Sequence, residues 1–182
     1  MARGRKSQYI KVLTGKDQEL IRGLGQVGVT SKEQIRNYLN INDERLLKLE
    51  RSGYIKSENV VIRGLAKTVF TLDRDGQKYC RDQLGIEHLY KWNSRQLHHD
   101  LKLAEAYYNF PINVRHTWRN ETDLLTEFSN GVPGTVPVLV DATILVSGEI
   151  IAIEAIGIGY TKSMIEAKVE FANTYFDGIK MF

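Results

Sequence analysis

Two carboxylates in the C-terminal half of the chain have a spacing at which they could act on one ligand. Asp141 lies in one apolar run, and Glu154 lies in the next run, thirteen residues later. Ser147-Gly148 separates the runs and has the residue types of a tight turn, so we expect two paired strands. Strand pairing brings such side chains to one end of a sheet. Two carboxylates with a shell of water are a natural Mg²⁺ site for phosphodiester hydrolysis.

Basic residues recur at helical spacing in the N-terminal half. Arg45, Lys48 and Arg51 are three residues apart, which places them along one exposed side of a helix. Leu46, Leu47 and Leu49 provide the apolar anchors of the same helix. A helix fits the major groove of duplex DNA, where its cations meet phosphates and guanine edges. The pattern therefore favours DNA binding over the alternatives, a charged face that is merely solvated or one that contacts a protein.

The charge of the chain is unevenly distributed. Residues 1–85 carry 17 Lys and Arg against 10 Asp and Glu, and residues 86–182 carry 8 against 12. These balances of +7 and −4 give the net charge of +3, and they favour nucleic acid as a partner of the first half. A single cysteine, Cys80, excludes an internal disulfide, and no apolar run reaches the length of a membrane span. We expect a cytoplasmic protein that does not enter a membrane.

Capping residues and glycines divide the first half into short elements. We expect helices that begin after Thr14, Thr30, Asn42 and Asp73. The first helix should end near Leu24 at Gly25 and Gly28, and Thr30 and Glu33 should form a capping box for the second. We also expect strands at 54–57 and 67–72, with a loop tip at Arg63-Gly64 between them. Two stretches resemble the recognition helix, wing and exit helix of winged-helix DNA-binding proteins: LLKLERSGYIKS and VFTLDRDGQKY. The resemblance covers about residues 11–84.

The winged-helix resemblance implies DNA contacts from the recognition helix and the wing, and the basic N-terminus suggests an arm that lies on phosphates. The expected contacts are Arg3, Arg5 and Lys6 of the arm, Lys32, Arg45, Lys48 and Arg51 of the helices, and Arg63 and Lys67 of the wing.

The second half alternates helical and strand-like segments, which suggests an α/β sandwich with a small mixed sheet. We expect a helix at 95–110, a strand at 113–118, a short helix at 120–125, strands at 136–146 and 149–156, and a helix capped by Thr161. The apolar end at 179–182 fits either an edge strand or a truncation of the chain. His98 and His99 lie in the first of these helices. Adjacent helical residues point about 100° apart and cannot easily share one ion, so we expect a packing or capping role for both.

The segment VPVLVDATILVSGEIIAIEAI resembles the core of the PD-(D/E)xK nucleases. Together with HHDLKLAEAYYNF, WRNETDLL and the segment up to FANTY, it is similar to the replication-relaxation proteins of plasmids and integrative elements. That family also has an N-terminal winged helix. The resemblance implies that Asp141 and Glu154 correspond to the catalytic and metal-binding carboxylates.

The chain departs from the nuclease pattern at two positions. The pattern has a lysine two residues after the glutamate, which activates water or stabilises charge, and Ile156 occupies that position here. Val140 stands before Asp141 where proline is usual. Lys162 and Lys168 on the following helix are candidates for a displaced amine, and Glu121 is a candidate for a further metal ligand. These departures favour a scaffold without catalysis over an active nuclease.

The sequence thus predicts an α+β protein with a flexible basic arm at 1–10, a winged helix-turn-helix DNA-binding domain at 11–85 and a nuclease-like α/β domain at 86–182. We expect it to bind duplex DNA without a cofactor, as an accessory to replication or mobilisation of a plasmid or mobile element. A replication protein, a relaxase or a second copy of the chain would be its partner. Two alternatives stay open: a Mg²⁺- or Mn²⁺-dependent endonuclease, and a transcriptional regulator whose second domain dimerises or senses a ligand.

Overall fold

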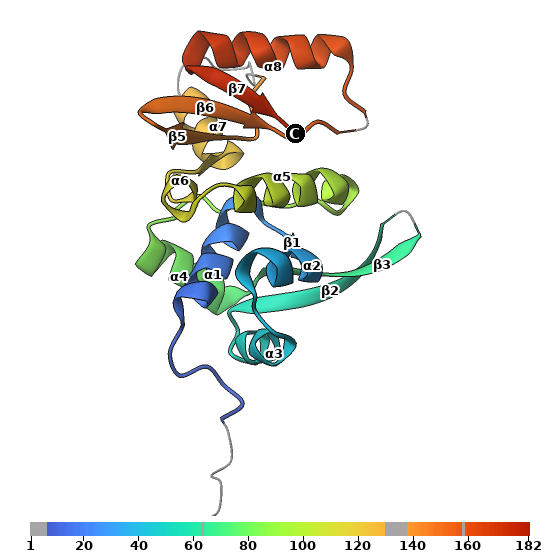
Figure 1. Ribbon diagram of the computed structural model, residues 1–182, viewed down its shortest axis with the longest axis vertical. Helices are drawn as coiled ribbons and strands as arrows, with labels where there is room; N and C mark the ends of the chain where they lie inside the picture. Colours follow the sequence, from blue (N-terminus) through green and yellow to red (C-terminus); the bar gives the residue numbers. More distant parts are fainter. Residues whose placement is uncertain (1–6, 63, 130–137, 158) are drawn as a thin grey trace, which may run out of the picture. The chain divides into compact units, whose positions relative to one another are not determined.

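The computed structural model describes residues 7–62, 64–129, 138–157 and 159–182. The expected α+β class is confirmed, since helices and strands alternate along the chain (Figure 1). The chain forms two compact units. The first comprises the described residues up to Gly25 together with Val29–Glu87, and the second comprises Gln26–Gly28 and His88–Phe182. Within the described ranges, no helix combines the length and the apolar character needed to cross a membrane.

The first unit combines short helices with a three-stranded antiparallel sheet. Its helices are α1 (Gly15–Val27), α2 (Lys32–Gln34), the π-helical turn η1 (Ile35–Leu39), α3 (Asp43–Arg51) and α4 (Arg74–Leu84). Its strands are β1 (Thr30–Ser31), β2 (Ile55–Ile62) and β3 (Leu65–Leu72), in the order β1-β3-β2. Apolar side chains from its helices and its strands are fully buried, among them Leu20, Ile21, Ile35, Leu49, Ile55 and Val69.

Local capping signals in this unit are largely confirmed. Asn42 caps α3 by accepting a hydrogen bond from the backbone of Arg45, and Asp73 caps α4. The predicted capping box of Thr30 and Glu33 is wrong by one residue, because Thr30 belongs to β1, where it pairs with Phe70. Ser31 and Gln34 form the box instead.

Two predicted boundaries in the first unit are wrong. The first helix continues through Gly25 to Val27, since each interior glycine costs a helix only about 1 kcal/mol and Leu24 and Val27 are buried. Gly28, with φ of +76°, follows its end. The hairpin is longer than predicted, because its ladder continues from Ile55↔Leu72 to Ile62↔Leu65. In residues 58–62 two polar residues are followed by three apolar ones, so no alternation marks this part as a strand.

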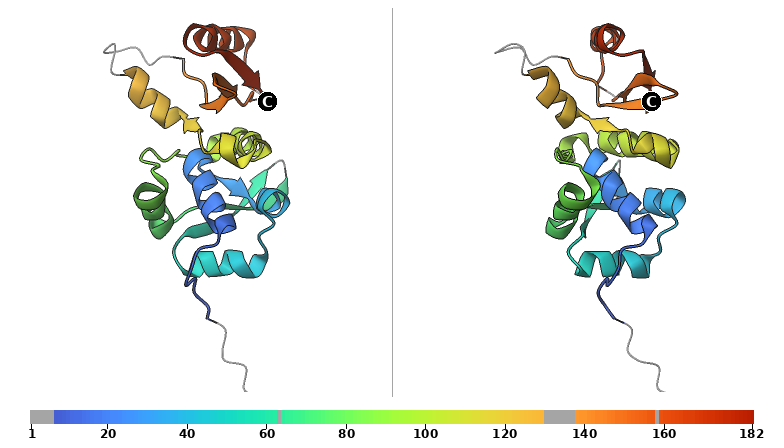
Figure 2. Two further views of the ribbon diagram at one scale, coloured as in Figure 1. Left: turned by 60° about the vertical axis from the view of Figure 1, so that its left-hand side comes forward. Right: turned by 90° about the vertical axis from the view of Figure 1, so that its left-hand side faces the viewer.

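The second unit is built on a four-stranded mixed sheet, as expected. Its strands are β4 (Arg119–Asn120), β5 (Ala142–Val146), β6 (Glu149–Glu154) and β7 (Gly178–Met181), in the order β4-β5-β6-β7. The pair β6 and β7 is parallel and the other pairs are antiparallel. Its helices are the 3₁₀ turn η2 (Ser94–Gln96), α5 (Leu97–Asn109), α6 (Ile112–Arg115), α7 (Glu121–Ser129) and α8 (Lys162–Tyr175). Figures 1 and 2 show α5 and α8 on opposite sides of this sheet.

The predicted strand at 113–118 is wrong, since this segment begins with α6. The carbonyl of Pro111 accepts hydrogen bonds from the backbone of Val114 and Arg115, so the proline starts a helical turn. A segment of six residues with two apolar ones carries too little periodicity to separate a strand from a helix. Asp141 also lies one residue before β5 rather than within a strand.

Other expectations for the second unit are confirmed. Ser147 and Gly148 have φ of 53° and 94° and form the tight turn between β5 and β6. Thr161 caps α8 by accepting a hydrogen bond from the backbone of Met164. Helices α7 and α8 contribute Leu124 and Ala172 to a cluster of buried residues with Val140 and Ala152. This cluster fixes α8 relative to the ends of the two hairpin strands.

Candidate active site

The hairpin brings Asp141 and Glu154 together at one end of the sheet. The register pairs Ala142 with Ile153, so the two carboxylates extend from neighbouring positions just beyond this pair. Glu154 Oε2 accepts the backbone N–H of Asp141 at 3.2 Å, and Asp141 Oδ2 accepts the backbone N–H of Ala155 at 2.6 Å. Asp141 is 4% exposed and Glu154 1%. Each of these two buried carboxylates is thus hydrogen-bonded to the backbone of the neighbouring chain segment.

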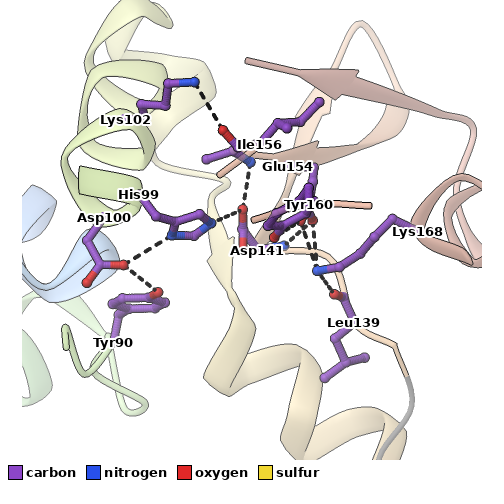
Figure 3. Close-up of polar contacts among 11 residues, drawn as sticks. Tyr90, His99, Asp100, Lys102, Leu139, Asp141, Glu154, Ile156, Tyr160 and Lys168 are labelled. Carbon is purple, nitrogen blue, oxygen red and sulfur yellow. Dashed lines mark hydrogen bonds and ion pairs between the residues drawn. The ribbon is translucent and has the colours of Figure 1, made fainter. Parts of the chain in front are cut away.

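Of the two lysines predicted to supply an amine, Lys168 reaches this pair and Lys162 does not. Lys168 Nζ lies 2.9 Å from Glu154 Oε1 and 3.1 Å from Oε2, and it also donates to the carbonyl of Leu139 (Figure 3). Its side chain is only 12% exposed. Lys162, at the first residue of α8, is 90% exposed and lies 3.6 Å from Glu166. Helix α8 therefore presents one lysine to the carboxylates and the other to solvent.

His99 of α5 links Asp141 to a second buried acid. Its Nε2 lies 3.1 Å from Asp141 Oδ2, and its Nδ1 lies 3.2 Å from Asp100 Oδ1. Asp100, which is 1% exposed, also accepts the Tyr90 hydroxyl at 3.2 Å and the backbone N–H of Asn93 at 3.0 Å. Figure 3 shows the imidazole between the two carboxylates. Residues 90 and 93, which precede α5, therefore hold Asp100, and Asp100 in turn orients His99 toward Asp141.

Tyr160 closes the cluster from the segment between β6 and α8. Its hydroxyl donates to Glu154 Oε1 at 2.6 Å, and its ring is stacked on His99 with the centroids 6.5 Å apart. Ile156, where the nuclease resemblance led us to expect a lysine, accepts a hydrogen bond from Lys102 Nζ through its carbonyl at 3.1 Å. The amine expected after Glu154 is thus absent at Ile156, while Lys168 contacts that glutamate from α8.

Asp141, His99, Tyr160 and Lys168 line a cavity of about 590 Å³. Glu121, the first residue of α7, lies in its wall together with Asp141, Lys168, His99 and Tyr160. Further lining residues are Tyr90, Arg95, Gln96, His98, Gly157, Gly159 and Met164. In the described part of the chain, the Glu121 carboxylate forms no hydrogen bond and no ion pair.

The cluster has more acidic side chains (Asp100, Glu121, Asp141 and Glu154) than basic ones (His99 and Lys168). Burial raises the pKa of Glu154, and the nearby Asp141 raises it further while Lys168 opposes the shift. Burial and then Asp141 likewise raise the pKa of Glu121. Burial by itself lowers the pKa of His99, but the hydrogen bonds to Asp100 and Asp141 outweigh it and raise that pKa to about 10. Both shifted glutamates indicate a site that would gain from a cation.

The donor set fits a hard divalent cation held by few protein ligands. Among the described residues, no group of three or more His, Cys, Asp or Glu side chains converges on one ion position. Mg²⁺ is nevertheless commonly bound by one or two carboxylates, with waters and substrate phosphates as the other ligands. Asp141 and Glu121 both line the cavity, and the oxygens of Glu154 are occupied by Lys168, Tyr160 and a backbone N–H. Asp141 and Glu121 are the carboxylates able to take such an ion.

The cations predicted to contact DNA in the first unit lie in different settings. Arg45 is held inside the unit, with Nη2 2.5 Å from Asp17 and 3.0 Å from the carbonyl of Val12. Arg51 is exposed at the end of α3. Three lysines form ion pairs at the surface: Lys32 with Asp43 at 2.9 Å, Lys48 with Glu44 at 2.8 Å and Lys67 with Glu33 at 2.7 Å. Arg3, Arg5, Lys6 and Arg63 lie outside the described residues.

The sequence interpretation missed His99, Asp100 and Tyr160 as members of the site. From the sequence, His98 and His99 were considered as ligands of one shared ion, and a hydrogen bond from His99 to two acids was not considered. The His-Asp pair within a helix was the available signal, because a carboxylate beside a histidine commonly orients its ring. Tyr160 gave no such signal, since a tyrosine beside glycines is common in loops.

Comparison with known proteins gives no relative from which a role could be transferred. No family model, no curated protein and no solved structure matches the chain.

Proposed function

We propose that this chain binds duplex DNA through its first unit and hydrolyses phosphodiester bonds in its second unit with a divalent metal ion. One observation carries the catalytic part of this proposal: Lys168 Nζ lies 2.9 Å from Glu154 beside Asp141. The sequence favoured an inactive scaffold because Ile156 occupies the position of the expected lysine. A lysine that reaches the same glutamate from α8 supports catalysis in spite of that substitution.

The arrangement of elements supports both halves of the proposal. A hairpin with one acid before its first strand and another at the end of its second, followed by a helix with the lysine, is consistent with a PD-(D/E)xK-like core. In the first unit, the order of α1, β1, α2, α3 and the β2–β3 hairpin is consistent with a winged helix. Their combination in one chain supports a protein of the replication-relaxation type, acting on plasmid or mobile-element DNA.

Each residue of the site has a separate role in this proposal. Asp141 and Glu121 would hold Mg²⁺ or Mn²⁺, which supplies an acidified water and charge stabilisation when it is bound. Lys168, which lines the cavity, would stabilise the negative charge that develops on the phosphate oxygens. Glu154 holds Lys168 and, through the Asp141 backbone, the first strand. Arg95 at the cavity wall is placed to contact a phosphate of the incoming strand.

A plasmid-nicking assay with matched lysine variants tests the catalytic proposal. Supercoiled plasmid is incubated with wild type, Lys168→Ala, Lys162→Ala and Asp141→Ala in Mg²⁺, in Mn²⁺ and in a chelator. We expect nicking by wild type that needs metal, a rate lowered by roughly 100-fold in Lys168→Ala, as for loss of a charge-stabilising donor, and no cleavage by Asp141→Ala. Lys162→Ala, an exposed lysine of the same helix, should cleave like wild type. Absence of nicking by wild type in both metals would refute the catalytic proposal.

A second candidate is a non-catalytic accessory protein that uses the same fold to bind DNA. The observation that favours it is the bonding of Glu154, whose two oxygens already accept from Lys168, Tyr160 and the Asp141 backbone. Such a network stabilises a scaffold even without a metal ion. Salt-dependent DNA binding by a protein that neither binds Mn²⁺ nor nicks plasmid would support this candidate.

A further inference from the structure

We propose that His99 is a positioning residue: it holds the Asp141 carboxylate by one oxygen and so keeps the other oxygen directed to the metal ion. This inference rests on the proposed metal-dependent function. It goes beyond that function by assigning a role to a helix that neither holds the ion nor contacts the scissile phosphate.

The two oxygens of Asp141 are bonded differently. Oδ2 accepts from His99 Nε2 at 3.1 Å and from the backbone N–H of Ala155 at 2.6 Å. Among the described residues, none donates a hydrogen bond to Oδ1. Two donors on one oxygen prevent rotation of the carboxylate about its bond to Cβ. Oδ2 is therefore hydrogen-bonded within the protein, and Oδ1 can bind a ligand in the cavity that Asp141 lines.

The ring of His99 is fixed on three sides. Asp100 accepts from Nδ1 at 3.2 Å, and the Tyr160 ring is stacked on the imidazole at an interplanar angle of 16°. Asp100 is itself held by the Tyr90 hydroxyl and the backbone of Asn93. A partner shell of this kind orients metal-binding groups, and its loss typically weakens metal binding by 10–100-fold.

The two hydrogen-bond partners of His99 also identify the ring nitrogen that contacts Asp141. An ionised carboxylate only accepts hydrogen bonds, and each ring nitrogen of His99 faces one. The imidazole therefore has a carboxylate acceptor on each side, and its Nε2 is the group that faces Asp141. His99 on α5 and Lys168 on α8 thus secure the two acids from opposite sides of the sheet (Figure 3).

The test measures Mn²⁺ affinity by isothermal titration and, separately, the dependence of plasmid nicking on Mn²⁺ concentration. The proteins are wild type, His99→Ala, His99→Gln and His116→Ala, whose histidine is exposed in the same unit. We expect His99→Ala to weaken Mn²⁺ binding at least tenfold and to raise the Mn²⁺ concentration at half-maximal nicking by the same factor. The rate at saturating Mn²⁺ should fall much less, and His116→Ala should match wild type.

Chemical rescue separates positioning from a merely structural role. Imidazole added to His99→Ala should fill the space left by the ring and restore Mn²⁺ affinity, whereas wild type measured in the same imidazole should not change. His99→Gln keeps a donor for Asp141 and most of the volume of the ring, so its loss should be smaller than that of His99→Ala. This variant keeps the test valid if the alanine variant does not fold.

Each outcome has one meaning. Normal Mn²⁺ affinity in both folded His99 variants would overturn the positioning role and leave the proposed nuclease standing. Wild type that neither binds Mn²⁺ nor nicks plasmid would overturn the proposed function, and this inference with it. Weakened binding that imidazole does not restore would mean that His99 supports the fold rather than the carboxylate.

Discussion

Lys168 Nζ lies within 3.1 Å of both carboxylate oxygens of Glu154, although the two residues are fourteen positions apart. The glutamate ends β6 and the lysine faces it from the second turn of α8. Helix α8 begins after its cap Thr161, seven residues beyond Glu154. An amine can therefore reach the acid from a helix as well as from the strand itself.

This contact predicts a large and specific loss of stability in Lys168→Ala. Removing the ammonium leaves Glu154, which is 1% exposed, without its charge partner, and breaking a buried ion pair costs about 3–5 kcal/mol. Lys162→Ala should stay within about 0.5 kcal/mol of wild type. Urea unfolding followed by tryptophan fluorescence measures both, because Trp92 and Trp118 belong to the second unit. If the two lysine variants unfold alike, the contact contributes nothing to the folded state.

The stability of the second unit should fall as the pH rises from neutral into the alkaline range. The pKa of His99 is raised from 6.5 to about 10, so its stabilising contribution is complete below pH 6.5 and is lost as the pH approaches 10. His99→Gln has no group that titrates there and should show a flatter profile. The difference in urea midpoint between the two proteins across pH 6–10 measures this effect, and parallel profiles would contradict the charged state of His99.

Arg45 should be required for the fold of the first unit rather than for reading DNA. Its guanidinium holds Asp17, which is 1% exposed, and the carbonyl of Val12. Arg45→Ala leaves that carboxylate buried without its partner and should cost about 1–3 kcal/mol. The matched control is Arg51→Ala, at the exposed end of the same helix, which should not change the unfolding transition. Circular dichroism at 222 nm during thermal unfolding compares them.

Arg51 should contribute to DNA affinity without contributing to stability. It is exposed at the end of α3, so its contact with phosphate can form without breaking a contact in the folded chain. Arg51→Ala should weaken binding to duplex DNA and reduce the slope of log affinity against log salt by about 1. Fluorescence anisotropy at several salt concentrations gives both quantities. An unchanged slope would exclude α3 from the contact surface.

Features that depend on neighbouring residues were predictable from the sequence. The caps Asn42, Asp73 and Thr161 were identified correctly, because a cap bonds to a backbone group within the next few residues. The proximity of Asp141 and Glu154 followed from a turn of two residues between their strands. The predicted strand at 113–118 was wrong because its six residues, four of them polar, have no periodicity that distinguishes a helical turn from a strand.

The sequence by itself determined the mixed α+β class, most helix starts and the hairpin that joins the two acids, since these arise from local hydrogen bonds and short turns. Only the tertiary structure decided which lysine of α8 reaches Glu154, because the packing of that helix on the sheet sets which of its sides faces the carboxylates. It likewise decided that His99 reaches Asp141, a residue 42 positions away. No periodicity or spacing encodes such a contact, since it depends on how a helix and a sheet are placed by the core between them.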